Sequence, residues 1–258
     1  MSPLTLYDLC VQNAPASVRF IDAARRNHRL PAARTLREDF SGGGGLALAW
    51  VASAKPRSAI AVDHDPAVLT RLLNSPRIKP ITADVHRCHQ PADVIAATNF
   101  SLGYFHTRAG LLRYLTLSRK RLNPKGSFIA DMYGGPSAFQ TRAQRRTFHL
   151  PDGTPVRYEF EQRNTDPLTG RVLNALHFTV GTGRNALKLR DAFVYDWRLW
   201  SLPELTDACQ NAGFTQIEFH DFEGGALDDT GAFHTRALQH GDQLNTNWVV
   251  YLVANKDA

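Results

Sequence analysis

The chain has 258 residues, of which 43% are hydrophobic, so it can bury a core large enough for one α/β domain with an insertion. No apolar run reaches about 18 residues, and the first residues lack the order of a signal peptide. The three cysteines, Cys10, Cys88 and Cys209, are too few and too far apart for a disulfide framework or a zinc site. We therefore expect a soluble, cytoplasmic protein with reduced thiols, no membrane segment and no metal.

The formal net charge is +6, and the basic residues gather in three clusters. The clusters are Arg25, Arg26, Arg29, Arg34 and Arg37; Arg113, Arg119, Lys120 and Arg121; and Arg142, Arg145 and Arg146. They carry no interleaved aromatic residues of the kind that bind single-stranded nucleic acid, so we interpret them as solvated helix faces and helix C-terminal charges. Nucleic acid remains an alternative partner, which this pattern does not favour.

An amphipathic helix is predicted first, over residues 17–27, and short β-rich runs then alternate with helical ones up to Tyr133. The predicted strands are 35–40, 58–63, 78–84, 92–99 and 126–133, and the predicted helices between them are 46–54, 66–74 and 107–122. This alternation is typical of a doubly wound parallel sheet.

The pattern changes after Tyr133. Three runs with alternating polarity, 154–164, 170–180 and 186–200, predict an antiparallel meander inserted in the α/β domain. A helix over 201–214 follows, with Ser201 as N-cap, Glu204 as its capping-box partner and Gly213 as the C-terminal signal. Two final strands, 214–222 and 248–256, have no helix between them and should pair antiparallel.

The ends of the parallel strands carry a consistent set of polar residues. The first strand ends in Glu38, Asp39 and Phe40 and continues through Ser41 into four glycines, Gly42 to Gly45, at the start of a helix. Glycines there let a ligand approach the backbone N–H groups. The next strands end in Asp63, in Asp84 and Val85, and in Asn99 and Phe100. Because ligands of open parallel sheets bind at this edge, these residues predict a nucleoside-shaped groove, suited to a dinucleotide or to S-adenosylmethionine.

Several motifs together resemble the class I, seven-strand Rossmann-like S-adenosylmethionine-dependent methyltransferases. EDFSGGG, AVDHDP and TAD look like the family's three acidic and glycine-rich motifs, and YDWRLWSLPEL…AGF looks like a stretch of its small-molecule type with a meander after strand five. The resemblance covers about residues 35 to 258. It implies a seven-stranded, mainly parallel sheet with an antiparallel last strand, a small antiparallel β insertion, and S-adenosyl-L-methionine as cofactor. Phe40 departs from the pattern, because the family has its first glycine there.

The resemblance implies one methyltransferase domain over residues 1–258. Its parts would be an N-terminal helical cap (1–34), a cofactor-binding core (35–133), an antiparallel β insertion or lid (134–200), and the C-terminal helix with the last two strands (201–258). Tyr7 and Gln12 resemble a segment that folds over the cofactor in related enzymes.

The same resemblance assigns site residues. Cofactor-binding positions are Glu38, Asp39, Phe40, Ser41, Gly42, Gly44, Asp63, His64, Asp84, Val85, Asn99 and Phe100. Catalytic candidates are His106 and Tyr133, and substrate candidates are Tyr104, Trp197 and Arg198. Structural alternatives stay open: Glu38 or Asp39 as a helix cap, His106 as an exposed helix-start residue, and Arg198 as a stacking partner of the tryptophans flanking it. Asp131 is expected to shape the sheet end rather than to catalyse.

Methyl transfer to a small-molecule acceptor by in-line displacement is the function that this resemblance favours. The alternatives are an RNA or protein methyltransferase that uses the basic surface, a non-catalytic module that binds S-adenosylmethionine, and an NAD-dependent oxidoreductase. The sequence does not indicate the acceptor, the methylated atom or the oligomeric state.

Overall fold

Seven strands form the central sheet of the computed structural model, which describes residues 1–222 and 224–257. The strands are β1 (Thr35–Asp39), β2 (Ser58–Asp63), β3 (Ile78–Thr82), β4 (Ala92–Ala97), β5 (Leu122–Gly134), β10 (Gln216–Asp221) and β13 (Trp248–Asn255). Their order is β10-β13-β5-β4-β1-β2-β3, and β13 alone runs antiparallel to its neighbours, β5 and β10. The predicted fold class is confirmed.

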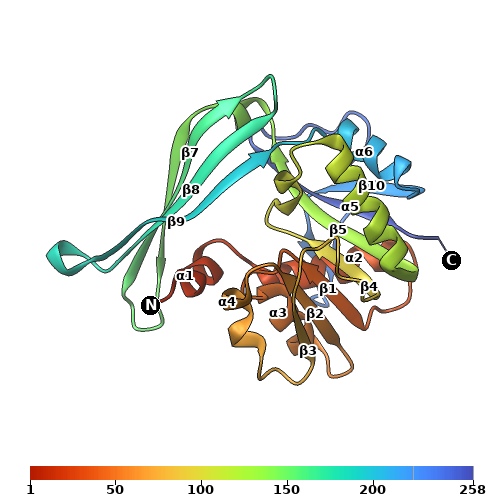
Figure 1. Ribbon diagram of the computed structural model, residues 1–258, viewed down its shortest axis with the longest axis horizontal. Helices are drawn as coiled ribbons and strands as arrows, with labels where there is room; N and C mark the ends of the chain where they lie inside the picture. The colour runs from red at the N-terminus through yellow and green to blue at the C-terminus, as the bar shows by residue number, and fades with distance from the viewer. Residues whose placement is uncertain (223, 258) are drawn as a thin grey trace.

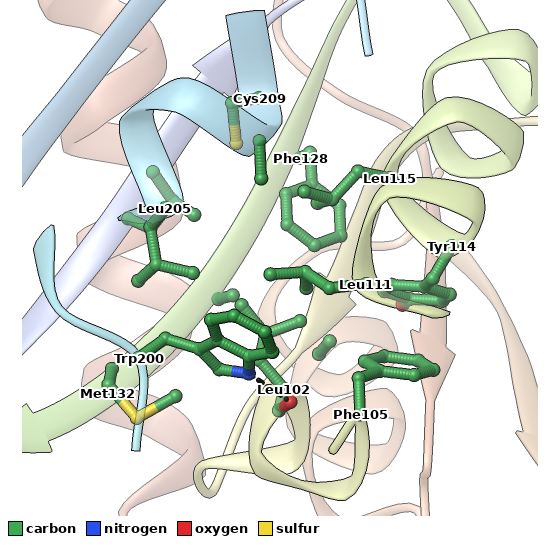
Figure 2. Packing of buried hydrophobic residues seen from close by; sticks show 14 of the residues in the cluster. Leu102, Phe105, Leu111, Tyr114, Leu115, Phe128, Met132, Trp200, Leu205 and Cys209 are labelled. Carbon is green, nitrogen blue, oxygen red and sulfur yellow. Dashed lines mark hydrogen bonds between the residues drawn. The ribbon is translucent and has the colours of Figure 1, made fainter. Parts of the chain in front are cut away.

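Helices cover both faces of this sheet (Figure 1). They are α2 (Ala14–Asn27), α3 (Gly45–Ser53), the short α4 (Pro66–Leu69), α5 (Arg108–Arg121) and α6 (Leu202–Asn211). The alternation of side chains along β5 divides the core: Phe128 packs with α5 and α6, whereas Ile129 packs with α2 and α3. Figure 2 shows the first of these layers, where Phe128 meets Leu111 and Leu115 of α5 and Cys209 of α6. Two apolar layers therefore hold the strands and fix the edge where they end.

The insertion is a four-stranded antiparallel sheet, which extends from the central sheet like an arm (Figure 1). Its strands are β6 (Arg142–His149), β7 (Pro155–Asp166), β8 (Arg171–Val180) and β9 (Leu187–Arg198). The sequence predicted only three, because β6 is mostly exposed and has no buried alternating face that a period of two would reveal. Arg142, Arg145 and Arg146 lie on this strand, so their assignment to a helix face was wrong.

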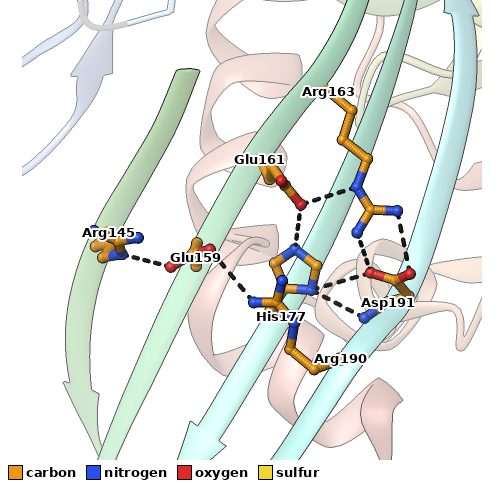
Figure 3. A network of polar contacts seen from close by, with 7 residues as sticks. All are labelled: Arg145, Glu159, Glu161, Arg163, His177, Arg190 and Asp191. Carbon is orange, nitrogen blue, oxygen red and sulfur yellow. Dashed lines mark hydrogen bonds and ion pairs between the residues drawn. The ribbon is translucent and has the colours of Figure 1, made fainter. Parts of the chain in front are cut away.

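One face of the arm is apolar and the other carries ion pairs. Val156, Tyr158 and Phe178 belong to a buried cluster on the apolar face. On the polar face, the Nδ1 atom of His177 accepts the backbone N–H of Asp191 at 2.9 Å, and its Nε2 atom donates to Glu161 at 2.9 Å (Figure 3). Polar and apolar side chains therefore alternate along the strands, as the sequence indicated.

A helix that the sequence did not predict begins the chain. Helix α1 (Pro3–Cys10) is capped by the side chain of Ser2 and places Leu6 and Cys10 in the apolar cluster of the arm. The prediction missed it because only eight residues form it, too few for a clear period. Tyr7 therefore lies on α1 rather than before the first helix.

Other boundaries differ by a few residues. The helix predicted over 66–74 is α4 followed by a 3₁₀ turn at Thr70–Leu72, and the predicted helix end at Leu122 is already the first residue of β5. The loop after β10 contains a two-residue hairpin, β11 (Ala226–Leu227) with β12 (Phe233–His234). The capping box of α6 is present as predicted, with hydrogen bonds in both directions between Ser201 and Glu204.

Some of the basic residues are buried rather than solvated, which corrects the sequence interpretation. Arg25, Arg37 and Arg121 are at most 6% exposed and donate to backbone carbonyls or buried acceptors. Arg25 and Arg26 do lie in the last turn of α2, as expected for charges near a helix C-terminus. All three cysteines are free and buried. Among the described residues, no helix is long and apolar enough to cross a membrane.

Candidate functional site

The glycine segment forms the turn from β1 into α3. Phe40, Gly42 and Gly44 have φ of 55°, 49° and 68°, the left-handed conformation that suits glycine. The backbone N–H of Ser41 donates to the Val62 carbonyl of β2 at 3.0 Å, which fixes the turn against the neighbouring strand. The non-glycine residue Phe40 therefore adopts a backbone conformation that costs about 1–2 kcal/mol.

The four glycines are there for different reasons. A Cβ atom at Gly43, Gly44 or Gly45 would lie within 2.6 Å of Arg71, Leu72 or Gln12, respectively. A Cβ atom at Gly42 would meet nothing within 4 Å. We expected a ligand to approach the whole segment, but protein side chains account for three of the glycines, and the open space lies at Gly42.

One buried hydroxyl at this turn has no hydrogen-bond partner among the described residues. The Ser41 Oγ is buried next to the open space at Gly42 in the sequence. Buried polar atoms in folded proteins are normally paired, so this hydroxyl needs a partner other than the described protein atoms, such as an ordered water molecule.

Glu38 caps helix α3. Its Oε2 atom accepts the backbone N–H of Ala47 at 2.8 Å, and the side chain is buried. Burial raises the pKa of Glu38 to about 8, although the N–H groups of Ala47 and Leu46 and the charge of Arg71 act in the opposite direction. Glu38 therefore acts as a helix cap, which is one of the structural alternatives proposed. Any contact with a ligand would be an additional role.

Asp39 points to the other face of the sheet. Both of its oxygens accept hydrogen bonds from the buried Arg37, at 2.7 and 3.0 Å, and Oδ2 also accepts the Tyr114 hydroxyl at 2.9 Å. Its side chain is 0% exposed. Successive side chains of a strand lie on opposite faces, so Asp39 points away from the face on which Glu38 caps α3. Asp39 has a structural role here, and its assignment to the cofactor site stays a prediction.

Asp63 closes the turn from the end of β2. Its Oδ2 atom accepts the N–H of Gly42 at 2.8 Å, and Oδ1 accepts the N–H of Asp65 at 3.1 Å. Each carboxylate oxygen can accept a further hydrogen bond. Asp63 thereby ties the open glycine to β2 and keeps acceptor capacity at the strand end.

A small cavity of about 80 Å³ lies beside Asp63. Its lining residues are Phe40, Asp63, His64, Ala83, Asp84 and Val85, of which all but Ala83 were assigned to the cofactor site from the sequence. Asp84 accepts hydrogen bonds from the backbone N–H and the Nδ1 atom of His86, at 2.7 and 2.9 Å. Burial acts to raise the pKa of Asp84, but the hydrogen bonds and charge of His86 together lower it.

The end of β4 has a strained turn. Asn99 and Phe100 have φ of 58° and 63°, and both of their N–H groups donate to the buried carboxylate of Asp131 on β5, at 3.0 and 2.6 Å. The 3₁₀ turn Ser101–Tyr104 begins directly after them. Asn99, Phe100 and Asp131 therefore form one hydrogen-bonded unit at the strand ends.

Aromatic side chains cluster at the ends of β1 and β4. The ring of Tyr104 stacks on that of Phe40 with 5.7 Å between centroids, and Tyr104 is 45% exposed. Trp197 is buried; its ring stacks on Tyr195 at 4.4 Å and meets Phe100 edge-on at 5.8 Å. Of the predicted substrate residues, Tyr104 is accessible, whereas Trp197 forms a wall behind it.

Tyr133 is held by the arm. Its hydroxyl donates to Gln162 Oε1 at 3.4 Å and accepts a hydrogen bond from Asn174 Nδ2 at 3.0 Å. Burial raises the pKa of Tyr133 to about 12, so the hydroxyl stays protonated at neutral pH. These contacts join the end of β5 to β7 and β8 and leave Tyr133 poorly placed as a proton acceptor.

His106 and Arg198 contact each other, and Arg198 also faces the larger cavity described below. The Nε2 atom of His106 lies 2.8 Å from the Asp196 carbonyl, which can only accept, so Nε2 carries the proton. Arg198 donates to the His106 carbonyl, pairs with Glu204 at 3.0 Å and stacks on Trp200 at 3.8 Å. Arg198 therefore stacks on a tryptophan, which is the structural alternative proposed for it. To contact an acidic acceptor, it would first have to break its ion pair with Glu204.

A larger cavity of about 310 Å³ lies beyond the end of β5. Tyr133 and Arg198 are among its lining residues, and its aromatic walls include Phe139, Trp200 and Trp248. The ring of Tyr133 also meets Phe100 edge-on at 4.9 Å. Tyr133 thus lies between this cavity and the strained turn at the end of β4.

Sequence reasoning missed the residues that bring α1 to the glycine turn. Arg71 donates through Nε to the Gly43 carbonyl and pairs through its guanidinium with Asp8 of α1. Gln12 packs on Gly45, and the ring of Tyr7 meets Phe193 of β9 at 5.2 Å. Tyr7 and Gln12 were noted as a resemblance, but Asp8 and Arg71 lie 63 positions apart and share no sequence signal.

No model of a protein family matches the chain, and no curated protein sequence is similar to it. Solved structures do resemble it. An S-adenosylmethionine-dependent methyltransferase from Clostridium acetobutylicum is 14% identical, with a TM-score of 0.69 over 99% of this chain and 98% of that one. DesVI from Streptomyces venezuelae is 17% identical, with a TM-score of 0.71 over 98% and 96% of the two chains.

A third similar structure, of an amino pentose methyltransferase from Micromonospora echinaspora with S-adenosylmethionine bound, is 15% identical, with a TM-score of 0.70 over 98% and 95% of the two chains. Because the sequence identities are this low, these similarities are evidence for the fold alone. Together with the strand order they show that the chain has the class I methyltransferase fold, with the β insertion included.

Proposed function

We propose that this protein is an S-adenosylmethionine-dependent methyltransferase that acts on a small-molecule acceptor. The observation that carries the proposal is the open space at Gly42, whose backbone N–H donates to Asp63 at the end of β2. These features lie at the carboxyl edge of a sheet with the methyltransferase strand order, where such folds bind ligands. An S-adenosylmethionine-dependent methyltransferase, an amino pentose methyltransferase and a sugar N-methyltransferase of similar fold support the same proposal.

The residues present suit the parts of such a cofactor. Asp63 keeps acceptor capacity for ribose hydroxyls, and the cavity between Phe40, Ala83 and Val85 offers an apolar lining for a flat base. Asp84 lies at the same cavity and is ionised near neutral pH, because its pKa is lowered. Glu38, Ser41, Gly42, Gly44, His64, Asn99 and Phe100 remain in the proposed cofactor site. Asp39 would act there through its contacts with Arg37 and Tyr114, because its side chain is fully buried.

Bound S-adenosylmethionine would supply a methyl group already activated on a positively charged sulfur. The protein then has to align an acceptor atom at about 3 Å and exclude water. Tyr104, which is partly exposed over Phe40, is the residue we place nearest to the acceptor. His106 and Tyr133 stabilise the structure around the site through their hydrogen bonds, and we assign them no role in proton transfer.

The acceptor class is proposed from the cavity beyond β5. Phe139, Trp200 and Trp248 give it flat aromatic walls, and Thr169 and Ser201 contribute hydroxyl groups. This mixture suits a compound with a ring and hydroxyl groups, such as a sugar, and two of the similar structures are sugar methyltransferases by name. A cytoplasmic location is part of this proposal.

Calorimetric titration with S-adenosylmethionine and S-adenosylhomocysteine tests the cofactor assignment. We expect the wild type to bind both, and Asp63→Ala to weaken both by about 1.5–3 kcal/mol, because charge-assisted hydrogen bonds are lost. Asp65→Ala is a matched control, since Asp65 caps α4 outside the cavity lining. Absence of binding by the wild type would refute the enzyme assignment, and unchanged affinity in Asp63→Ala would refute the placement of the ribose.

A further inference from the structure

Two consecutive residues at the end of β4 adopt a conformation that their side chains disfavour. Asn99 and Phe100 both have positive φ, at 58° and 63°. This conformation costs Phe100 about 1–2 kcal/mol, and it costs Asn99 less because asparagine tolerates the left-handed region. Strain of this kind persists where the surroundings hold it, and it gathers at functional sites. The surroundings that hold these two residues therefore need to be identified.

Asp131 is what holds them. Its Oδ2 atom accepts the Asn99 N–H at 3.0 Å, its Oδ1 atom accepts the Phe100 N–H at 2.6 Å, and the residue is 5% exposed. Hydrogen bonds to a carboxylate are roughly twice as strong as neutral ones. A buried carboxylate with one oxygen for each N–H thus stabilises the left-handed pair that the chain alone would not keep.

This turn carries groups of the proposed transfer site. The Phe100 ring packs edge-on against Tyr133 and Trp197, and the Phe100 carbonyl accepts the Gly103 N–H at 2.9 Å. The 3₁₀ turn that follows ends at Tyr104, whose ring lies on Phe40. A change in the direction of the two peptide groups would therefore move both the Asn99 carbonyl and Tyr104.

We infer that Asp131 is a positioning residue that sets the shape of the cofactor-binding turn by fixing Asn99 and Phe100. This inference rests on the proposed function and deepens it. It predicts that the affinity for the cofactor depends on Asp131, which lies two strands away from the glycine turn. Asp131 acts through backbone geometry, so its effect does not depend on the charge of the cofactor sulfur.

The test uses the full chain and the variant Asp131→Asn, which keeps the side-chain size but presents an NH₂ group to one of the two N–H donors. We expect affinity for S-adenosylhomocysteine, whose sulfur is neutral, to fall about 10-fold or more, and affinity for S-adenosylmethionine to fall equally. Equal losses distinguish positioning from attraction between Asp131 and a charged sulfur.

Asp93→Asn is the matched control. Asp93 also accepts two consecutive backbone N–H groups, those of Arg34 and Thr35 at 2.8 and 2.9 Å, but it lies at the opposite, amino end of the sheet. Its replacement should lower the midpoint of thermal unfolding and leave both affinities within about two-fold of wild type. A similar loss of affinity in Asp93→Asn would mean that general destabilisation explains both variants, and would overturn the inference.

A second variant keeps the test decisive if Asp131→Asn folds poorly. Asn99→Gly adopts positive φ without cost, so the double variant Asn99→Gly/Asp131→Asn should recover part of the lost stability and affinity. No recovery, wild-type affinity in Asp131→Asn, or a loss confined to S-adenosylmethionine would each overturn the inference while the proposed function stands. Failure of the wild type to bind either compound would instead remove the proposed function, and the inference with it.

Discussion

Phe40 is the residue at which this chain departs from the glycine pattern of the fold that it shares. It keeps the positive φ that a glycine would have there, and its ring contacts Tyr104, Phe105 and Tyr114 while lining the small cavity. The aromatic contacts offset the cost of the backbone conformation. Phe40 thus has the left-handed backbone conformation of a glycine, and its aromatic ring forms one wall of the cavity, where a glycine would leave only backbone.

Replacement of Phe40 by two small residues separates these effects. Both Phe40→Ala and Phe40→Gly lose the ring contacts, but only alanine keeps the strain of positive φ, so the glycine variant should be the more stable by about 1 kcal/mol. Urea unfolding measures the difference. At Ala97, which lies within strand β4 and has no positive φ, replacement by glycine should instead destabilise. An alanine variant at least as stable as the glycine variant would contradict the strain at Phe40.

Glu38 should make stability depend on pH in an unusual direction. Burial raises its pKa from 4.5 to about 8 in the folded protein, so between these values the folded state binds more protons than the unfolded state. The free energy of unfolding from this group therefore falls as pH rises from about 4.5 to about 8, by at most about 1.4 kcal/mol per pH unit.

Glu38→Gln isolates that contribution, because glutamine can still accept the Ala47 N–H but does not ionise. The difference in free energy of unfolding between variant and wild type should shift in favour of the variant across this pH range. Denaturant unfolding at several pH values measures it, and Asp131, whose pKa burial raises to about 6, titrates equally in both proteins. Parallel curves for the two proteins would contradict the raised pKa of Glu38.

Helix α1 and strand β6 were not predicted from the sequence. Helix α1 inserts Leu6 and Cys10 into the arm, while its Asp8 pairs with Arg71 at the glycine turn. Strand β6 is mostly exposed, since it forms one edge of the arm. Both elements are stabilised by tertiary contacts rather than by local periodicity, so the sequence alone carried little signal for them. The elements of the central sheet, in contrast, have buried runs and turn residues that predict them well.

The two sheets share one hydrophobic core. Val172 of β8 and Trp197 of β9 belong to the same cluster as Ile95 of β4 and Met132 of β5, and Tyr133 adds hydrogen bonds across the junction. An arm that buries part of the core of the central sheet should not unfold separately from it. The single domain over residues 1–258 remains our proposal on this basis.

Single-tryptophan variants test this proposal. Trp50 reports on α3 beside the central sheet and Trp197 reports on the arm, with the remaining tryptophans replaced by phenylalanine. We expect the two fluorescence signals and the far-ultraviolet circular dichroism to give one urea midpoint. A lower midpoint reported by Trp197 alone would show that the arm is an independent unit.

The sequence by itself determined the α/β class, the strand order implied by the family resemblance, and the positions at which the strands end, because buried runs, capping residues and glycines act over a few neighbouring positions. Only the tertiary structure decided how those strand-end residues are used. Asp39 turns to the opposite face and pairs with Arg37, three of the four glycines make room for protein side chains, and Asp131 joins the turn at Asn99. These outcomes depend on partners distant in the chain, and no local pattern encodes such contacts.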